Sequence, residues 1–159
     1  MAFASHLGPW LLGTVKNTTG TTAGTIRNMG ATVVSQANTL AYTDTSAKQM
    51  FVLPAGAQIL SFTVDATTAF NSGTNNVITI SDPSGNSLAT VTATSANITL
   101  GRATVAVTGA QIAEYVNVGS TDFIVSAVFA GTGTAATTGA ATITCQYVVR
   151  NSDGSANPA

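Results

Sequence analysis

The side chains that could carry out chemistry are few and widely spaced along this chain of 159 residues. The sequence contains one histidine, His6, one cysteine, Cys145, and two lysines. General acid–base and nucleophilic catalysis need such a group beside a partner, with a pKa near the working pH. His6 lies in a glycine-rich stretch, where a catalytic geometry is hard to hold. Cys145 lies within a hydrophobic strand pattern, where a thiol stays protonated and unreactive.

The carboxylates give no clearer indication of an active site. A pair of the glycosidase type remains possible if distant strands bring two acids together. Turn formation explains Asp82, while Asp65 and Asp122 are predicted at strand ends. The sequence has no calcium loop, phosphate-binding loop or nucleophile elbow, and Cys145 has no ligand partner at metal-binding spacing. We therefore expect a protein that is not an enzyme and that needs no cofactor and no metal.

The composition predicts a surface with unusually little charge. Only 7% of the residues are charged and the net charge is −1, whereas about 25% charged residues is typical of globular domains. We expect neighbouring subunits to cover much of the surface; the alternative is a hydroxyl-rich surface that faces solvent. The five basic residues do not cluster, which argues against nucleic-acid binding. No apolar run approaches the ~20 residues of a membrane span, and residues 1–15 lack a signal-peptide pattern, so we expect synthesis in the cytoplasm.

Short alternating patterns separated by turn residues predict an all-β protein, because threonine and other β-branched residues favour strands. Leu60, Phe62 and Val64 are expected on one buried face, and Pro54-Ala55-Gly56 and the segment 82–86 are expected to form turns. One helical turn is expected at residues 110–115. The strands are predicted at residues 31–42, 49–53, 60–65, 77–80, 88–91, 96–100, 103–107, 123–129 and 142–150, the last with Ile143, Cys145, Tyr147 and Val149 facing the core.

This spacing predicts an antiparallel two-sheet β-sandwich of jelly-roll or immunoglobulin-like type. We expect residues 1–30 to form an extended N-terminal arm, residues 31–150 the sandwich, and residues 151–159 a flexible tail. The arm has few apolar side chains, and its predicted partner-binding residues are Leu7, Trp10, Leu11 and Leu12. Alternatively, Trp10 covers the core of its own subunit.

One stretch of the sequence resembles the decoration, or cement, proteins of tailed-bacteriophage capsids. The resemblance covers residues 49–80 and is carried by Phe51-Val52-Leu53-Pro54-Ala55-Gly56-Ala57-Gln58-Ile59 and by Phe62-Thr63-Val64-Asp65-Ala66-Thr67-Thr68-Ala69-Phe70-Asn71. It implies a virion protein on the outer capsid surface that binds the major capsid protein and stabilises the head. It also implies a homo-oligomer, often a trimer, while the composition and hydropathy argue against a nucleic-acid or membrane partner and for synthesis in the host cytoplasm.

Two other functions stay open at this point. The first is a structural component of the phage tail, the portal region or a fibre. The second is a carbohydrate-binding sandwich that recognises a host surface, which would need exposed aromatic side chains. The candidates for such a platform are Trp10, Tyr42, Tyr115 and Tyr147, although the alternation predicts that Tyr147 is buried.

Overall fold

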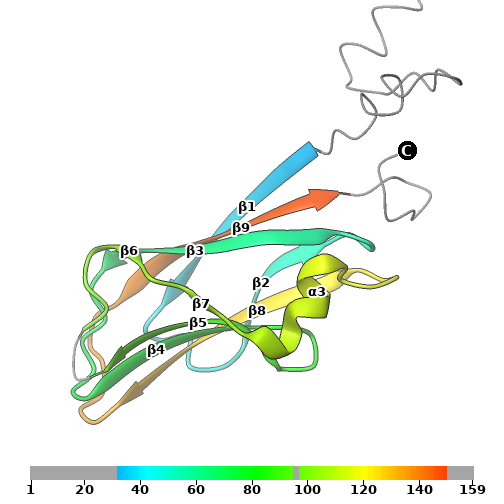
Figure 1. The fold of residues 1–159 in the computed structure, drawn as a ribbon. Helices are drawn as coiled ribbons and strands as arrows, with labels where there is room; N and C mark the ends of the chain where they lie inside the picture. Colours follow the sequence, from blue (N-terminus) through cyan, green and yellow to red (C-terminus); the bar gives the residue numbers. More distant parts are fainter. Residues whose placement is uncertain (1–31, 95–96, 150–159) are drawn as a thin grey trace, which may run out of the picture.

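The computed structural model describes residues 32–94 and 97–149, which form a β-sandwich of two layers (Figure 1). One sheet has the strand order β1-β9-β3-β6, and the other has the order β2-β8-β4-β5-β7. The strands are β1 (Thr32–Ala41), β2 (Lys48–Leu53), β3 (Gln58–Thr68), β4 (Asn75–Ser81), β5 (Ser87–Thr94), β6 (Gly101–Ala103), β7 (Ala106–Val107), β8 (Phe123–Thr132) and β9 (Ala140–Val149).

The strands pair in a nested pattern that defines the topology. β1 pairs with β9, β2 with β8, β3 with β6, and β4 with β5, all antiparallel. The chain is therefore one long hairpin, with its tip between β4 and β5, rolled into two sheets. This is a jelly-roll arrangement. The immunoglobulin-like alternative is excluded, because that fold keeps its first two strands in one sheet, whereas β1 and β2 lie in different sheets.

Both predicted turns are confirmed. After β2, the amide of Ala57 donates to the carbonyl of Pro54 at 3.1 Å, and Gly56 has a φ of 74° that favours glycine. This turn is a corner that carries the chain from the five-stranded to the four-stranded sheet. At the hairpin tip, the Asp82 carboxylate accepts a hydrogen bond from the Asn86 amide at 2.7 Å, and the Gly85 amide donates to the Asp82 carbonyl.

The core lies between the two sheets and contains the predicted faces of the last two strands. The inward side chains of β8 are all buried, and Cys145 is completely buried in β9. The side chain of Val149 lies outside the described part of the structure. The buried side chains that confirm the alternation are Phe123, Val125, Ala127 and Phe129 in β8 and Ile143, Cys145 and Tyr147 in β9.

The predicted position of Leu60 is wrong. Its side chain is 44% exposed, whereas Phe62 and Val64 are buried as expected. The reason is an irregularity in the β3–β9 pairing between Ile59 and Ser61, which fits a β-bulge at Leu60. A bulge inserts one extra residue and reverses the inward and outward positions that precede it. Ile59 therefore points into the core instead of Leu60.

The strands expected at residues 96–100 and 103–107 also differ from the structure. In the described part of the first range only an isolated bridge between Ile98 and Phe70 forms, and the second range is replaced by the short strands β6 and β7. The expectation that Asp65 lies at a strand end is wrong, because Asp65 pairs with Arg102 of β6 and lies inside β3. The expected helical turn is confirmed as a 3₁₀ turn (Gly109–Gln111) followed by α3 (Ile112–Val116).

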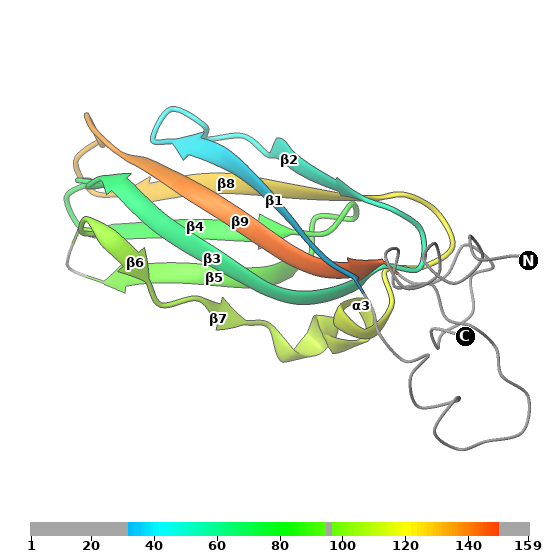
Figure 2. The ribbon, with the colours of Figure 1, turned by 90° about the horizontal axis from the view of Figure 1, so that it is seen from above.

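The helix α3 packs against β3, at the end of the sandwich where β1 begins and β9 ends (Figures 1 and 2). Within residues 32–94 and 97–149, no helix is both long enough and apolar enough to cross a membrane.

Candidate interaction surface

The predicted arm residues Leu7, Trp10, Leu11 and Leu12 lie outside the described residues, as does His6. The structure therefore places none of them. The surface that the structure describes belongs to the sandwich. The titratable side chains of the sandwich determine which chemistry this surface can support.

Cys145 has no features of a reactive thiol. Its side chain is completely buried, and burial raises the pKa of the thiol to about 12. A nucleophilic or metal-binding cysteine needs an accessible thiolate. In the described ranges, no group of three or more His, Cys, Asp or Glu side chains could hold a metal ion.

The charged side chains of the strands are neutralised in two ion pairs. The Lys48 ammonium lies 2.9 Å from the Asp44 carboxylate, and the Arg102 guanidinium meets Asp65 with two hydrogen bonds of 2.9 and 3.0 Å. The hydrogen bond from Arg102 lowers the pKa of Asp65. A hydrogen bond from the Ala41 amide, followed by one from Lys48, lowers the pKa of Asp44. Lys48, Asp65 and Arg102 are the only charged residues in the nine strands.

The fold also brings together two acids, Asp82 and Glu114, which the sequence placed on separate elements. Burial and the neighbouring Asp82 raise the pKa of Glu114. For Asp82, burial is the largest single effect and raises the pKa, but hydrogen bonds from Asn86 and other neighbours together outweigh it, so the pKa of Asp82 is lowered. Two carboxyl groups whose pKa values are pushed apart are typical of acid–base pairs in enzymes. The sequence offered no signal of this pair, because its two residues lie 32 positions apart on separate elements.

The surroundings of this acid pair favour a structural role. Asp82 is only 4% exposed, and its two carboxylate oxygens accept hydrogen bonds from the amide and side chain of Asn86. The pair joins the β4–β5 turn to α3, where the Tyr115 hydroxyl also donates to the carbonyl of Leu88 at 3.0 Å. A pocket of about 250 Å³ lies elsewhere, lined mainly by residues of β5, β6 and the segment that joins them. The acid pair therefore fastens α3 to the sandwich.

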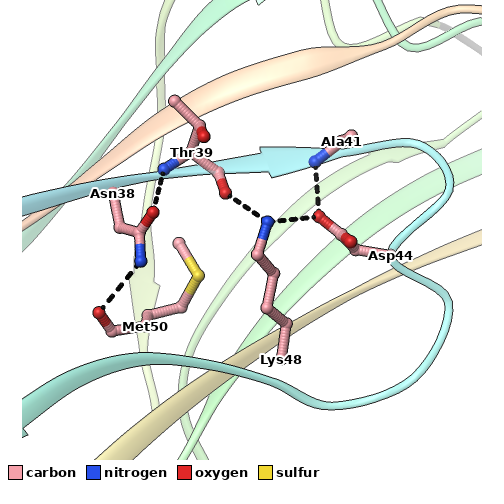
Figure 3. Close-up of polar contacts among 6 residues, drawn as sticks. All are labelled: Asn38, Thr39, Ala41, Asp44, Lys48 and Met50. Carbon is pink, nitrogen blue, oxygen red and sulfur yellow. Dashed lines mark hydrogen bonds and ion pairs between the residues drawn. The ribbon is translucent and has the colours of Figure 1, made fainter.

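Polar side chains close one long side of the sandwich, where β1 and β2 are the edge strands of their sheets (Figure 3). Asn38 of β1 donates its side-chain amide to the carbonyl of Met50 in β2 at 3.2 Å. The Lys48 ammonium donates to the carbonyl of Thr39 at 2.8 Å, and the Asp44 carboxylate accepts from the amide of Ala41 at 2.8 Å.

A second amide side chain continues this closure. Gln36 donates both to the carbonyl of Val52 at 3.2 Å and to the Tyr147 hydroxyl at 2.7 Å. Edge strands expose unpaired backbone groups that can pair with another chain. Gln36 and Asn38 satisfy two carbonyls of β2, so this edge is blocked along much of its length.

The outer faces of both sheets consist mainly of uncharged side chains. On the four-stranded sheet these are mainly Ser, Thr and Ala side chains together with the exposed Val33, and within the described strands of this sheet the only charges are the paired Asp65 and Arg102. On the five-stranded sheet, Val52 and Ile124 face each other across β2 and β8 and are 40% and 39% exposed. Further apolar side chains are exposed around α3, namely Leu60, Ile112 and Val116.

The aromatic side chains of the sandwich do not form an exposed platform. Tyr115 and Tyr147 are 8% and 4% exposed, so two of the four candidates for sugar stacking are buried. Tyr42 is partly buried against the core, and Trp10 lies outside the described residues. The described surface therefore gives no support to a carbohydrate-binding site.

Comparisons with known proteins find similarity only at the level of the fold. No protein-family model matches the sequence, and no curated protein matches it significantly. A chain in the acidic stable capsid structure of Helicobacter pylori bacteriophage KHP30 is 9% identical with a TM-score of 0.49, over 74% of this chain and 87% of that one. A chain in the cyanophage Pam1 capsid asymmetric unit is 17% identical with a TM-score of 0.49, over 76% of this chain and 86% of that one.

Proposed function

We propose that this protein is a structural protein of a bacteriophage virion and not an enzyme. Specifically, we propose a capsid decoration, or cement, protein that binds the outer surface of the major capsid protein lattice and stabilises the head. The sandwich would make the main contacts with neighbouring subunits, and the N-terminal segment would provide an additional attachment.

The observation that carries this proposal is the lack of free charge on the strands. Nine strands contain only Lys48, Asp65 and Arg102 as charged residues, and all three are in ion pairs. Independent soluble domains commonly rely on interspersed surface charges to prevent association. A sandwich with two almost uncharged faces is instead suited to lie between neighbouring subunits.

The segment that resembles decoration proteins has a clear structural role in this fold. It forms β2, the corner at Pro54, β3 and the loop that leads into β4. Phe70 is completely buried, and the following Asn71 accepts hydrogen bonds from the amides of Thr137 and Thr138 at 2.9 and 3.1 Å. Several residues that carry the resemblance thus fill the core and fasten one end of the sandwich.

The proposed mechanism is multivalent attachment. Each subunit adds modest contacts to the capsid lattice, through the sheet faces and the arm residues Leu7, Trp10, Leu11 and Leu12. Linking copies in an oligomer, for which we propose a trimer, makes later contacts intramolecular and raises their effective concentration. Tight binding then needs no large charged interface.

The test is binding to capsids of the parent phage that have been prepared without this protein. We expect the purified protein to co-sediment with these capsids, to saturate at a fixed number of copies per capsid, and to raise the temperature at which they rupture. The matched pair of variants is Ile124→Asp and Thr144→Asp, which place one charge on the outer face of the five-stranded or the four-stranded sheet. The variant with the charge on the face that contacts the capsid should lose its binding to capsids, and the other variant should keep it.

Failure of the wild-type protein to bind capsids, while it binds purified tails or portal assemblies, would overturn the decoration role and favour the tail, portal or fibre alternative. Electron microscopy of intact virions with labelled protein separates these locations directly.

A further inference from the structure

The edges of the two sheets are not equally protected. β6 and β7 are edge strands of only three and two residues, and short edges offer little to a partner strand. β1 and β2 are longer edges and lie along the same side of the sandwich (Figure 2). Two carbonyls of β2 are blocked by the side chains of Gln36 and Asn38.

The hydrogen bonds at the end of β1 show which of its residues face the open side. The amide of Thr39 donates to the Asn38 side chain, its carbonyl accepts from Lys48, and the amide of Ala41 donates to Asp44. These backbone groups therefore point away from β9. Since backbone direction alternates along an antiparallel strand, the odd-numbered residues of β1 face the edge.

The first half of this edge is open. Val33, Ser35 and Ala37 belong to the odd-numbered set, and within the described ranges no residue forms a hydrogen bond with their outward amides and carbonyls. The side chains of all three are exposed, Val33 at 55%. This half also lacks the lysine, proline or bulge with which proteins commonly protect an edge. β1 is thus capped at Thr39 and Ala41 and unprotected from Val33 to Ala37.

We propose that the open half of β1 pairs with the same half of β1 in a second copy of this chain. The pairing is antiparallel and two-fold symmetric, with Ser35 opposite Ser35 of the second copy and Val33 opposite its Ala37. The caps at Thr39 limit the contact to five residues in each chain and centre it on Ser35. Antiparallel self-pairing is the arrangement in which one strand edge serves as its own partner.

The side chains of this segment suit the proposed contact. Ser35 and Ala37 are small and uncharged, so two copies approach without steric or electrostatic repulsion. The exposed Val33 side chain is covered by Ala37 of the second copy. The outward amides and carbonyls of three residues in each chain supply six hydrogen bonds. The two four-stranded sheets then join into one continuous sheet. A two-fold contact pairs only two copies, so it does not form the proposed trimer and would instead link a subunit of one trimer to a subunit of another.

The first experiment is oxidative cross-linking of Ser35→Cys in free solution, with the wild-type chain as control. In a hydrogen-bonded antiparallel pair the two Cα atoms lie about 5.5 Å apart, within the roughly 4.4–6.8 Å that a disulfide spans. We expect Ser35→Cys to form a covalent dimer under mild oxidation. The wild-type chain should form none, because Cys145 is completely buried.

The register supplies matched controls. Val33→Cys alone should not cross-link, because it faces Ala37 of the second copy, whereas the double variant with Val33→Cys and Ala37→Cys should. Ser35→Pro removes the central outward amide, which lies outside the β1–β9 ladder, so the fold should persist by circular dichroism. Dimer association should weaken by at least about tenfold, while Ser35→Thr retains it.

Absence of the Ser35→Cys dimer, or equal cross-linking of Val33→Cys alone, would overturn the proposal. Cross-linking that appears only after removal of residues 1–30 would also overturn it, since the N-terminal segment would then be the occupant of the edge. The experiment uses no capsids, so its result is independent of the proposed decoration role. A chain that cross-links as expected but does not bind capsids would contradict that role alone.

Discussion

Gly139 is the residue at which a single added methyl group should disturb this fold most. It precedes β9 with a φ of 150°, in a region that side chains rarely adopt. A Cβ atom built there would clash with Cδ1 of Phe70. Phe70 is completely buried and packs against Phe129 with ring centroids 4.8 Å apart, so its ring has little room to move.

The expected cost of Gly139→Ala combines two effects. Overpacking of a filled core costs about 1–3 kcal/mol, and an unfavourable backbone conformation costs about 1–3 kcal/mol. We expect the free energy of unfolding to fall by about 2–6 kcal/mol in total. For a domain of this size, each kcal/mol lowers Tm by about 2–4 °C.

Denaturant unfolding of three further variants separates the two effects. Gly85 has a φ of 86°, but a methyl group added there would have nothing within 4 Å, so Gly85→Ala should show the backbone cost alone. Combining Gly139→Ala with Phe70→Leu should cost at least about 1 kcal/mol less than the sum of the two single changes, because the smaller side chain leaves space. Additive costs, or equal losses for Gly139→Ala and Gly85→Ala, would refute the steric explanation.

Three further predictions concern other parts of the molecule. Cys145→Ser should lower the free energy of unfolding by about 1–3 kcal/mol, through burial of a poorly paired hydroxyl; rapid reaction of native Cys145 with a thiol reagent would contradict its burial. The folded pKa of Glu114 is raised, so its contribution to stability is present at low pH and is lost as the pH rises through that pKa. Glu114→Gln stays uncharged, so its stability relative to wild type should increase as the pH rises above about 4. Parallel stability–pH profiles of the two proteins, measured by chemical denaturation, would show that Glu114 does not take up a proton on folding. Deletion of residues 1–20 should leave a folded sandwich that binds capsids much more weakly, whereas loss of the β-type circular dichroism spectrum would show that the segment belongs to the core.

The strands with regular alternation were predictable from the sequence. The inward positions of β8 from Phe123 to Phe129 are all apolar, and β9 alternates apolar and polar residues from Ala141 to Tyr147, so both burial patterns agree with the prediction. The turn after Asp82 was also predictable, because each of its residues suits a turn position. These features depend on local chemistry, which the sequence contains directly.

Features that depend on long-range pairing were not predictable. The irregular pairing at Leu60 arises between β3 and β9, and no local signal distinguishes it from regular alternation. The same holds for Asp82 and Glu114, which meet only because α3 packs beside the β4–β5 turn. The strand order that separates a jelly roll from an immunoglobulin-like sandwich is likewise a property of the whole chain.

The side chains that close the β1–β2 side were also not predicted from the sequence. Gln36 and Asn38 stand at inward positions of β1, where the alternation alone predicts apolar residues. Their side chains bond to carbonyls of β2, which is a strand of the other sheet. The sequence did contain one signal for this: Gln36 and Asn38 are polar residues at inward positions of the first predicted strand, which indicates side chains that bond to a neighbouring strand edge.

The nested pairing of the strands has a consequence for how the chain folds. The innermost pair, β4 and β5, closes across a turn of a few residues, whereas Thr32 at the start of β1 pairs with Val149 at the end of β9. Contacts between residues so distant in sequence form slowly, because the entropy of a large loop must be lost first. We expect the hairpin tip to form early and β1 to join last. A chain leaving the ribosome would then complete its outermost strand pair only after β9 has emerged, so assembly through β1 would follow the completion of synthesis.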